Sequence, residues 1–186
     1  ALALIIQQVT GLKWQDYIKI KIFSISGMKS STITDGSHPS SGVSHAYLPI
    51  GNTWTERDFG EEPTFNAAGN GGVWSNVDEL YLYEKAIRSN LFVEAEVNLL
   101  SRNIYPLTNW TDSIPSHMGL SWVISKLNGH TVYSHTGSQG GFTSDFVSIP
   151  EEGFFYCILS NVPLEIMDTR RNVLAHALDR GWIKKK

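Results

Sequence analysis

The chain has 186 residues, which is long enough for one domain with a hydrophobic core. Hydrophobic residues make up 41% of it and charged residues 18%, as is typical of globular proteins, and no apolar run reaches the roughly 20 residues of a membrane span. The net charge of -3 leaves no basic surplus for binding nucleic acid. One cysteine, Cys157, excludes an internal disulfide and leaves the cellular compartment open.

The chain opens with "ALALIIQQVTG", which has no initiator Met and an apolar run too short for a secretory signal. Apolar residues at helical spacing predict a helix that ends at Gly11, and a second helix is predicted over residues 14–23. Because the first residues are typical of the middle of a helix, we expect the chain to be part of a longer or processed protein.

Residues 30–72 are rich in Ser, Gly, Pro, Thr and Asn without a sustained period, and predict a long irregular segment with few regular elements. The next helix is predicted to begin at Ser75, because Ser75 and Asp78 form a variant of the capping box. A shorter helix is predicted over residues 93–100.

The pattern then changes to short β-rich segments: "LSWVISKL", "HTVYSHTG", "GFTSDFVSIP" and "GFFYCILSN". Asn128-Gly129 predicts a tight hairpin, and Gly140-Gly141 separates the next two strands. Pro163 is placed in the first turn of a final amphipathic helix. Helices first, then an antiparallel meander, then a closing helix predict an α+β fold.

The stretch "YSHTGSQGGFTSDFVSIP" places His135 and Ser138 three residues apart, as in a base and a serine nucleophile. A serine hydroxyl needs its base within about 3 Å. In a β-strand, side chains at odd separation point to opposite faces. We therefore expect these two side chains to diverge, so that Ser138 is not the nucleophile.

Gly137, Gly140 and Gly141 allow the backbone to approach a ligand closely, so that an N–H can face a developing oxyanion. The same glycines are equally suited to a bulge or a turn, and the sequence leaves both interpretations open. The histidines and the cysteine lack the spacing of metal ligands, so we predict no metal site and no cofactor.

Four segments follow one another along the chain: "LALIIQQVTGLKWQDYIKIKIFSISGMKSS", "GNGGVWSNVDELYLYEKAI", "MGLSWVI" and "HTGSQGGFTSDFVSIPEEGFFYCILSN". Together they resemble the serine β-lactamase and penicillin-binding-protein superfamily, especially class C β-lactamase-like esterases and peptidases. The last segment resembles the third active-site motif, which in this group is often H-x-G in place of K-T-G. The resemblance implies a sheet domain and a helical domain with the site in the cleft between them.

On this resemblance, His135 takes the position of the motif's lysine, Thr136 supplies a substrate-binding hydroxyl, and Gly137 is the position of close approach. Ser138 offers its backbone N–H as half of the oxyanion hole, and Tyr47 is expected to line the cleft. A histidine is largely neutral at pH 7 and holds a substrate carboxylate less well than a lysine. The replacement therefore favours esters, amides or peptides over β-lactams.

The family's nucleophilic motif, S-x-x-K, and its Y-x-N motif are both expected upstream of the first helix. Y-x-N does not occur in the chain, and S-x-x-K occurs once, at residues 26–29. Gly27 disfavours the helical turn that would bring Lys29 beside Ser26. Loss of a nucleophile costs on the order of a millionfold in turnover, so we expect this chain alone to be nearly inactive.

We expect residues 1–115 to form part of a helical domain with long loops, and residues 116–186 to form the strands and last helix of a sheet domain that is incomplete on its N-terminal side. The parent protein is expected to hydrolyse a small-molecule or peptide substrate through an acyl-serine. The alternative is a non-catalytic peptide- or glycan-binding module on the same fold. An incomplete sheet exposes an unpaired edge, so we also expect self-association.

Overall fold

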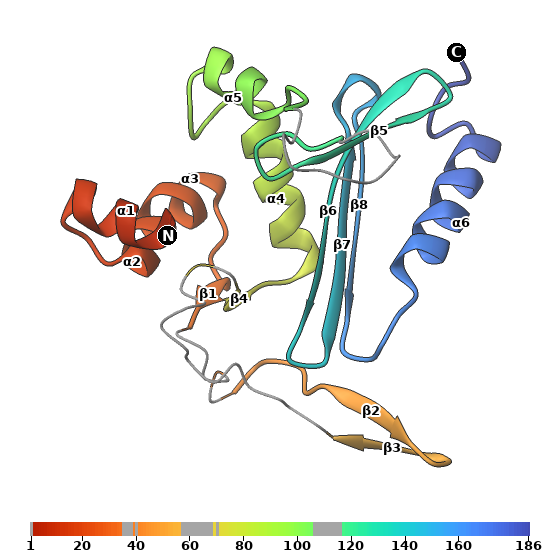
Figure 1. Ribbon diagram of the computed structural model, residues 1–186, viewed down its shortest axis with the longest axis horizontal. Coiled ribbons are helices and arrows are strands. Elements are labelled where there is room, and N and C mark those ends of the chain that lie inside the picture. Colours follow the sequence, from red (N-terminus) through yellow and green to blue (C-terminus); the bar gives the residue numbers. More distant parts are fainter. Residues whose placement is uncertain (1, 35–38, 40, 57–68, 70, 106–116) are drawn as a thin grey trace.

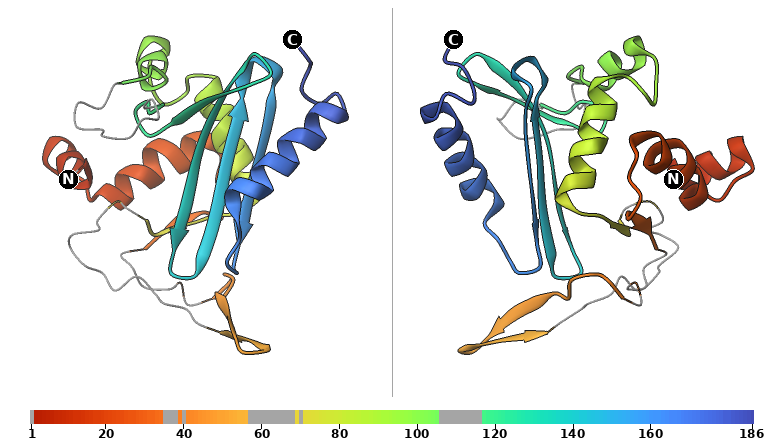
Figure 2. Two further views of the ribbon diagram at one scale, coloured as in Figure 1. Left: turned by 45° about the vertical axis from the view of Figure 1, so that its right-hand side comes forward. Right: turned by 180° about the vertical axis from the view of Figure 1, so that it is seen from behind.

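An antiparallel sheet of four strands forms the centre of the structure. The computed structural model describes residues 2–34, 39, 41–56, 69, 71–105 and 117–186. The strand order is β5-β6-β7-β8, with bounds β5 (Val123–Leu127), β6 (His130–Gln139), β7 (Phe142–Ile149) and β8 (Phe154–Ser160). One face carries α6 (Ile166–Asp179) and the other carries α4 (Val77–Arg88) (Figure 1 and Figure 2). The predicted α+β fold, an antiparallel sheet with flanking helices, is confirmed.

Two tight turns set the register of this sheet. Asn128 and Gly129 have φ of 47° and 85°, and Gly140 and Gly141 have φ of 58° and 88°. A two-residue turn of type I′ needs positive φ at both positions, which Asn-Gly and Gly-Gly adopt with little strain. The predicted hairpins are therefore present, with Leu127 opposite His130 and Gln139 opposite Phe142.

The N-terminal helices pack beside α4. α1 (Leu2–Thr10) ends at Gly11, as predicted. The second helix comprises α2 (Trp14–Ile18), a π-helical turn η1 (Lys19–Phe23) and α3 (Ser24–Ser26), and it ends at Gly27 with φ 79°. The predicted helix over residues 14–23 thus continues for one more turn. These helices and the following segment enclose a buried apolar cluster of Ala3, Trp14, Phe23, Met28 and Ile33.

Residues 30–72 contain more regular structure than we predicted. β2 (Tyr47–Ile50) and β3 (Thr53–Glu56) form a projecting hairpin, and β1 (Thr32–Ile33) pairs with β4 (Val73–Trp74) (Figure 1). The sequence analysis did not locate these short strands, although β2 contains Pro49, which an edge strand tolerates. Residues 35–38, 40, 57–68 and 70 of this segment lie outside the described part of the chain.

Two helix starts differ from the prediction. The cap of α4 is Asn76, whose side-chain oxygen accepts a hydrogen bond from the Glu79 N–H at 2.9 Å. The Ser75 hydroxyl instead bonds the Ser31 hydroxyl at 2.7 Å. α6 begins at Ile166, so Pro163 precedes the helix and is not in its first turn. α5 (Ala95–Ser101) lies within one or two residues of its predicted range.

The carboxylate of Glu79 joins α4 to the segment that follows α3. Its Oε1 accepts hydrogen bonds from the N–H groups of Lys29 and Ser30, at 2.8 and 2.7 Å, and from the Ser30 hydroxyl at 2.7 Å. Its Oε2 accepts from the Ser31 N–H at 2.7 Å and from the Ser31 hydroxyl. Burial raises the pKa of Glu79, but the bonds from Ser31 and Ser30 outweigh it and lower the pKa to about 2.

A buried ion pair fastens α6 to the sheet. Arg170 Nε donates to Asp145 Oδ2 at 3.0 Å, and Nη2 donates to Oδ1 of the same carboxylate. Arg170 Nη1 also donates to Ser134 Oγ at 3.1 Å, and the Tyr156 hydroxyl donates to Asp145 Oδ2 at 2.6 Å. These bonds connect α6 with β6, β7 and β8. The apolar core beside them consists of Val132, Val147, Ile149, Leu174, Ala177 and Ile183.

Replacement of Arg170 tests this connection. Arg170→Met leaves the Asp145 carboxylate, which is 1% exposed, buried without its cation. We expect the free energy of unfolding in urea to fall by about 3–5 kcal/mol, as when one partner of a buried ion pair is removed. Arg171→Met is the matched control, because Arg171 pairs with Asp168 at the surface, and it should change stability by less than about 0.5 kcal/mol. Equal losses in the two variants would contradict the assignment.

The lowered pKa of Glu79 predicts an acid-dependent loss of stability. The ionised carboxylate favours the folded state, so its contribution is complete above pH 4.5 and is lost as the pH falls toward about 2. Glu79→Gln should lower stability at pH 7 and flatten the dependence of the unfolding free energy on pH in this range. Asp78→Asn, at an exposed neighbouring position, should leave that dependence in place. If Glu79→Gln lost stability in acid as steeply as the wild-type chain, the loss would have to come from other groups.

Candidate functional site

The segment from His135 to Ser138 lies in the second half of β6. The pairing of β6 with β7 is regular, with His135 opposite Phe146 and Thr136 opposite Asp145. Side chains therefore alternate along it. Ser134 faces α6, where it bonds Arg170, so Thr136 and Ser138 have their side chains on the α6 face. His135 and Gly137 lie on the opposite face, toward α4.

His135 and Ser138 are thus not a base and its nucleophile. Both side chains are exposed, and they leave opposite faces of one strand. The expectation from spacing holds because β6 is regular through Gln139, and the glycines bend the chain only after it.

The second half of β6 has a strand on only one side among the described residues. β5 begins at Val123, opposite Ser134, so residues 135–139 pair with β7 alone. The Thr131 N–H points to the β7 side, where it donates to Glu151 Oε1 at 3.2 Å. Since N–H directions alternate along a strand, the N–H groups of Thr136 and Ser138 point to the open edge. This edge can accept hydrogen bonds from, and donate them to, an extended ligand.

Gly137 has a specific packing role. A Cβ at this position would lie 2.5 Å from the Ser144 hydroxyl, which extends over Gly137 from the neighbouring strand. A larger residue here would force the Ser144 hydroxyl to move. Ser144 consequently stands on the same face as His135, a position that the sequence analysis missed because only strand register reveals it.

The proposed cleft residue Tyr47 lies at the start of β2. Its N–H donates to the Asn161 carbonyl at 2.8 Å, just beyond the end of β8, and its hydroxyl donates to Glu56 Oε2 at 3.2 Å. Tyr47 therefore approaches the end of the sheet at which the β6–β7 turn lies (Figure 1).

The S-x-x-K sequence at residues 26–29 does not form an activated serine. The Ser26 hydroxyl donates to the Ile22 carbonyl at 2.7 Å inside its own helix. Gly27 then ends the helix in a left-handed conformation, and the Lys29 backbone is held by Glu79. Ser26 and Lys29 are thus not on successive turns of one helix, as the motif requires.

Aromatic side chains cover the α4 face of the sheet beside His135. Phe146 contacts Trp122, Tyr83 and Phe155, with ring centroids 5.8, 6.1 and 5.0 Å away. Burial raises the pKa of Tyr83, which remains a neutral phenol. Trp122 and Tyr83 also line a pocket of about 270 Å³ between α4, α5 and the segment before β5. Trp122 therefore contributes both to the aromatic surface and to the pocket lining.

Arg102 contacts the aromatic ring of Tyr133 in β6. Its guanidinium lies 4.9 Å from the centre of the Tyr133 ring. Burial lowers the pKa of Arg102, and the nearby Tyr133 and Glu84 offset part of that effect. Within the described ranges, no group of three or more His, Cys, Asp or Glu side chains is placed to hold a metal ion.

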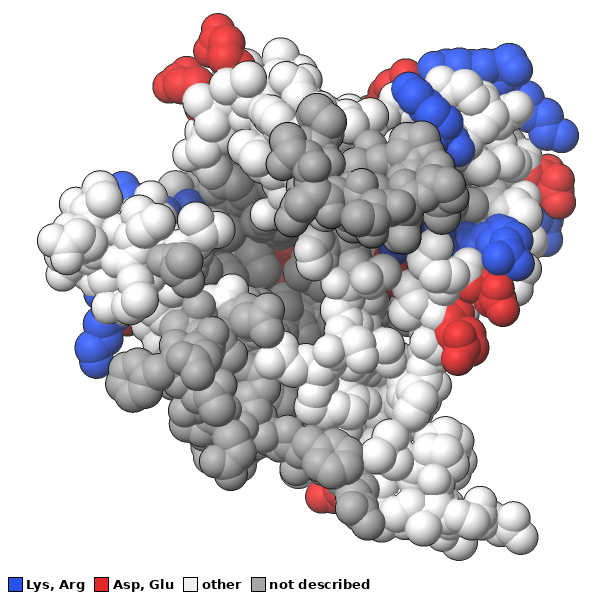
Figure 3. Space-filling model, viewed as in Figure 1, with Lys and Arg blue, Asp and Glu red and all other residues white. Residues whose placement is uncertain are grey.

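The surface around β6 is largely uncharged. β6 contains no Lys, Arg, Asp or Glu, and the charged side chains on this face of the molecule gather near α6 and around the helices (Figure 3). No helix in the described part of the chain is long and apolar enough to cross a membrane.

The contact between Gly137 and Ser144 predicts coupled mutations. Gly137→Ala should lower the free energy of unfolding by about 1–3 kcal/mol, as overpacking does. Ser144→Ala removes the clashing hydroxyl and leaves Cβ at an ordinary 3.8 Å, so the double variant should recover much of the loss. A double-mutant cycle from urea unfolding measures the coupling. Additive effects would contradict a direct contact.

Comparison with known proteins agrees with this geometry. Residues 1–179 match the Beta-lactamase family. The structure is similar to an octameric penicillin-binding protein homologue from Pyrococcus abyssi, with 24% identity and a TM-score of 0.76 over 97% of this chain and 40% of that chain. It is also similar to the penicillin binding protein from Bacillus halodurans, with 15% identity and a TM-score of 0.75 over 94% of this chain and 53% of that chain. No curated protein matches the sequence significantly.

A third similar structure is the D-amino acid amidase from Ochrobactrum anthropi SV3 complexed with D-phenylalanine. It has 17% identity and a TM-score of 0.74, over 96% of this chain and 56% of that chain. The chain thus spans between 40% and 56% of the length of these three neighbours. At such identities the likeness shows the fold. With the family match over residues 1–179, it shows that the chain belongs to the Beta-lactamase family and has the fold of serine β-lactamases and penicillin-binding proteins.

Proposed function

We propose that the chain provides the substrate-binding wall of a serine acyl hydrolase acting on an ester, amide or peptide. The observation that carries the proposal is the open edge of β6, where the N–H groups of Thr136 and Ser138 face outward. An extended substrate can add to such an edge through backbone hydrogen bonds. The Ser138 N–H then serves as one donor of the oxyanion hole, which is the position expected from the H-x-G motif.

His135 orients the substrate from the α4 face. It projects beside Phe146 and near the aromatic surface, so the substrate meets an imidazole and apolar rings instead of a lysine. This favours a substrate without a carboxylate at that point. The side chain of Thr136 lies on the α6 face. In this proposal Thr136 therefore binds substrate through its backbone, and its hydroxyl reaches a ligand only around the edge of the strand.

The nucleophile does not come from residues 1–186 in this proposal. The Ser26 hydroxyl donates to a backbone carbonyl, and the side chains of Ser138 and His135 lie on opposite faces of β6. The chain by itself therefore binds substrate without turning it over. The division into a partial helical domain over residues 1–115 and sheet elements over 116–186 belongs to the same proposal.

Self-association through a sheet edge is a further part of the proposal. β8 has β7 on one side and no strand on the other among the described residues, and unpaired edges invite pairing with another chain. The homologue from Pyrococcus abyssi is octameric. Sedimentation that shows only monomer at high protein concentration would contradict this part alone.

A fluorophosphonate probe and a chromogenic ester test for a nucleophile. We expect neither stable labelling nor turnover by the 186-residue chain. Labelling that maps to Ser26 or Ser138 would overturn the claim that the nucleophile is absent from these residues.

Binding of an N-acetyl dipeptide amide, followed by NMR of backbone amides, tests the open edge. We expect the Thr136 and Ser138 signals to shift. Ser138→Pro removes the outward N–H and should weaken binding roughly 3- to 10-fold, as for loss of a neutral hydrogen bond. Ser138→Ala keeps the N–H and should bind normally. Equal weakening in both variants would mean that the hydroxyl is used and would contradict the proposal.

If the full-length parent fails to turn over ester or amide while this binding persists, the chain is a non-catalytic module.

A further inference from the structure

The pocket beside Trp122 lies next to the point where the open edge of β6 begins. β5 starts opposite Ser134, and Trp122 directly precedes β5. The Trp122 ring contacts Phe146, which is the cross-strand partner of His135. A ligand strand that adds to residues 135–139 runs in line with β5, so the end of the ligand nearest β5 meets Trp122.

The size of the pocket fits one side chain. Its volume is about 270 Å³. An apolar cavity of about 150 Å³ is enough to bind benzene, and pockets for drug-sized molecules begin at about 300 Å³. The pocket therefore has room for a single aromatic ring with its linking atoms, or for a large aliphatic side chain, but not for a whole peptide.

The lining of the pocket is uncharged. It combines apolar and aromatic side chains with a few amides and hydroxyls, and none of the described lining residues is Lys, Arg, Asp, Glu or His. A charged group would lose its hydration here without gaining a partner of opposite charge. The lining thus selects an apolar occupant. Its main walls are Tyr83 and Ile87 of α4, Val97 and Asn98 of α5, and Leu120 and Trp122 before β5.

Hydrogen bonds hold the walls of the pocket together. Asn98 Nδ2 donates to the Ile87 carbonyl at 2.8 Å and to Asn90 Oδ1 at 2.6 Å, so both of its amide hydrogens are used. The Ser101 hydroxyl donates to the Asn98 carbonyl at 2.7 Å, and the Leu120 N–H donates to the Ser101 carbonyl at 2.8 Å. These bonds join α4, α5 and the segment before β5. The pocket is therefore formed before a ligand arrives, which lowers the cost of ordering it on binding.

We propose that this pocket is the specificity subsite of the β6 edge and takes an uncharged aromatic or large aliphatic side chain of the substrate. The inference rests on the proposed function, since the substrate must first add to β6. Trp122 and Tyr83 connect the two places, because both line the pocket and both contact Phe146. Val97 and Leu120 also line the pocket and are 50% and 57% exposed. An inserted side chain removes part of this apolar surface from water, which favours binding.

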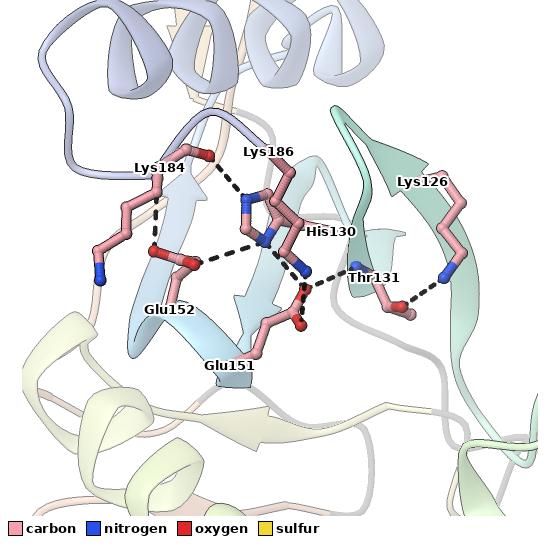
Figure 4. Close-up of polar contacts among 7 residues, drawn as sticks. All are labelled: Lys126, His130, Thr131, Glu151, Glu152, Lys184 and Lys186. Atoms are coloured by element: carbon pink, nitrogen blue, oxygen red, sulfur yellow. Dashed lines mark hydrogen bonds and ion pairs between the residues drawn. The ribbon is translucent and has the colours of Figure 1, made fainter.

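The charged cluster at the start of β6 differs from this pocket. His130 Nδ1 lies 2.9 Å from Glu151 Oε1, and Nε2 lies 2.7 Å from the Lys184 carbonyl oxygen (Figure 4). Lys186 Nζ donates to Glu151 Oε2 at 3.0 Å. His130 is 0% exposed, and these contacts fasten the C-terminal segment to the sheet. The charges there are paired within the protein, whereas the pocket beside Trp122 offers open apolar space.

Binding of three N-acetyl dipeptide amides to the isotope-labelled full chain, followed by NMR, tests the subsite. The peptides carry Ala-Ala, Phe-Ala and Ala-Phe. One of the two Phe peptides should bind about 10-fold more tightly than the Ala-Ala peptide, as expected for burial of a phenyl group. It should also shift the methyl signals of Ile87 and Val97, which the Ala-Ala peptide should leave in place. Equal affinities, or methyl signals that do not move, would contradict the subsite.

The amide signals of Thr136 and Ser138 separate this inference from the proposed function. If all three peptides shift these signals with equal affinity, the edge binds substrate and only the subsite is wrong. If no peptide binds, the proposed function fails and the subsite fails with it.

Val97→Trp fills the pocket from α5 and should make the three affinities similar. Leu99→Trp is the matched control, because Leu99 is 65% exposed on the same helix and lies outside the residues that line the pocket. It should retain the preference for one Phe peptide. A preference that persists in Val97→Trp would overturn the assignment of the pocket. The methyl signals of the wild-type chain give an answer that does not depend on the folding of either variant.

Discussion

The ion pair between Asp145 and Arg170 fixes the sheet and its closing helix relative to each other. It has bonds to β6 through Ser134 and to β8 through Tyr156, so a shift of α6 breaks contacts with three strands. Asp145 is also the cross-strand partner of Thr136. The buried pair therefore lies directly behind the β6 segment whose other edge is open. Because a buried charge without its partner is costly, this arrangement opposes displacement of α6 and β7 behind the open edge.

Rigidity of this edge matters for the chemistry that the fold supports. A backbone N–H stabilises a developing oxyanion only if it is held in position before the reaction. The close packing of Ser144 over Gly137 and the two-residue turn at Gly140-Gly141 restrict the same segment from the β7 side. The glycines thus serve strand packing and turn geometry together, and both roles are compatible with the proposed substrate-binding wall.

Carboxylates connect parts of the chain that are distant in sequence. Glu79 binds backbone 48 to 50 residues away, Asp145 binds Arg170 across 25 residues, and Glu151 joins His130 and Lys186. Each carboxylate accepts several donors, and several of those donors are cationic or backbone N–H groups. The pKa values of Glu79 and Glu151 are lowered to about 2, so these two ionised carboxylates stabilise the fold at neutral pH and lose this effect in acid.

The sequence by itself determined the strand meander, its two tight turns, most helix ranges and the family, because these depend on local φ preferences, side-chain period and motif order. It also predicted that His135 and Ser138 diverge, since alternation is a local property of a strand. It did not reveal the β2–β3 hairpin, the cap at Asn76, the hydroxyl of Ser144 over Gly137 or the acceptors around His130. Those features depend on contacts between residues far apart in the chain, and only the tertiary structure decides which donors and acceptors meet.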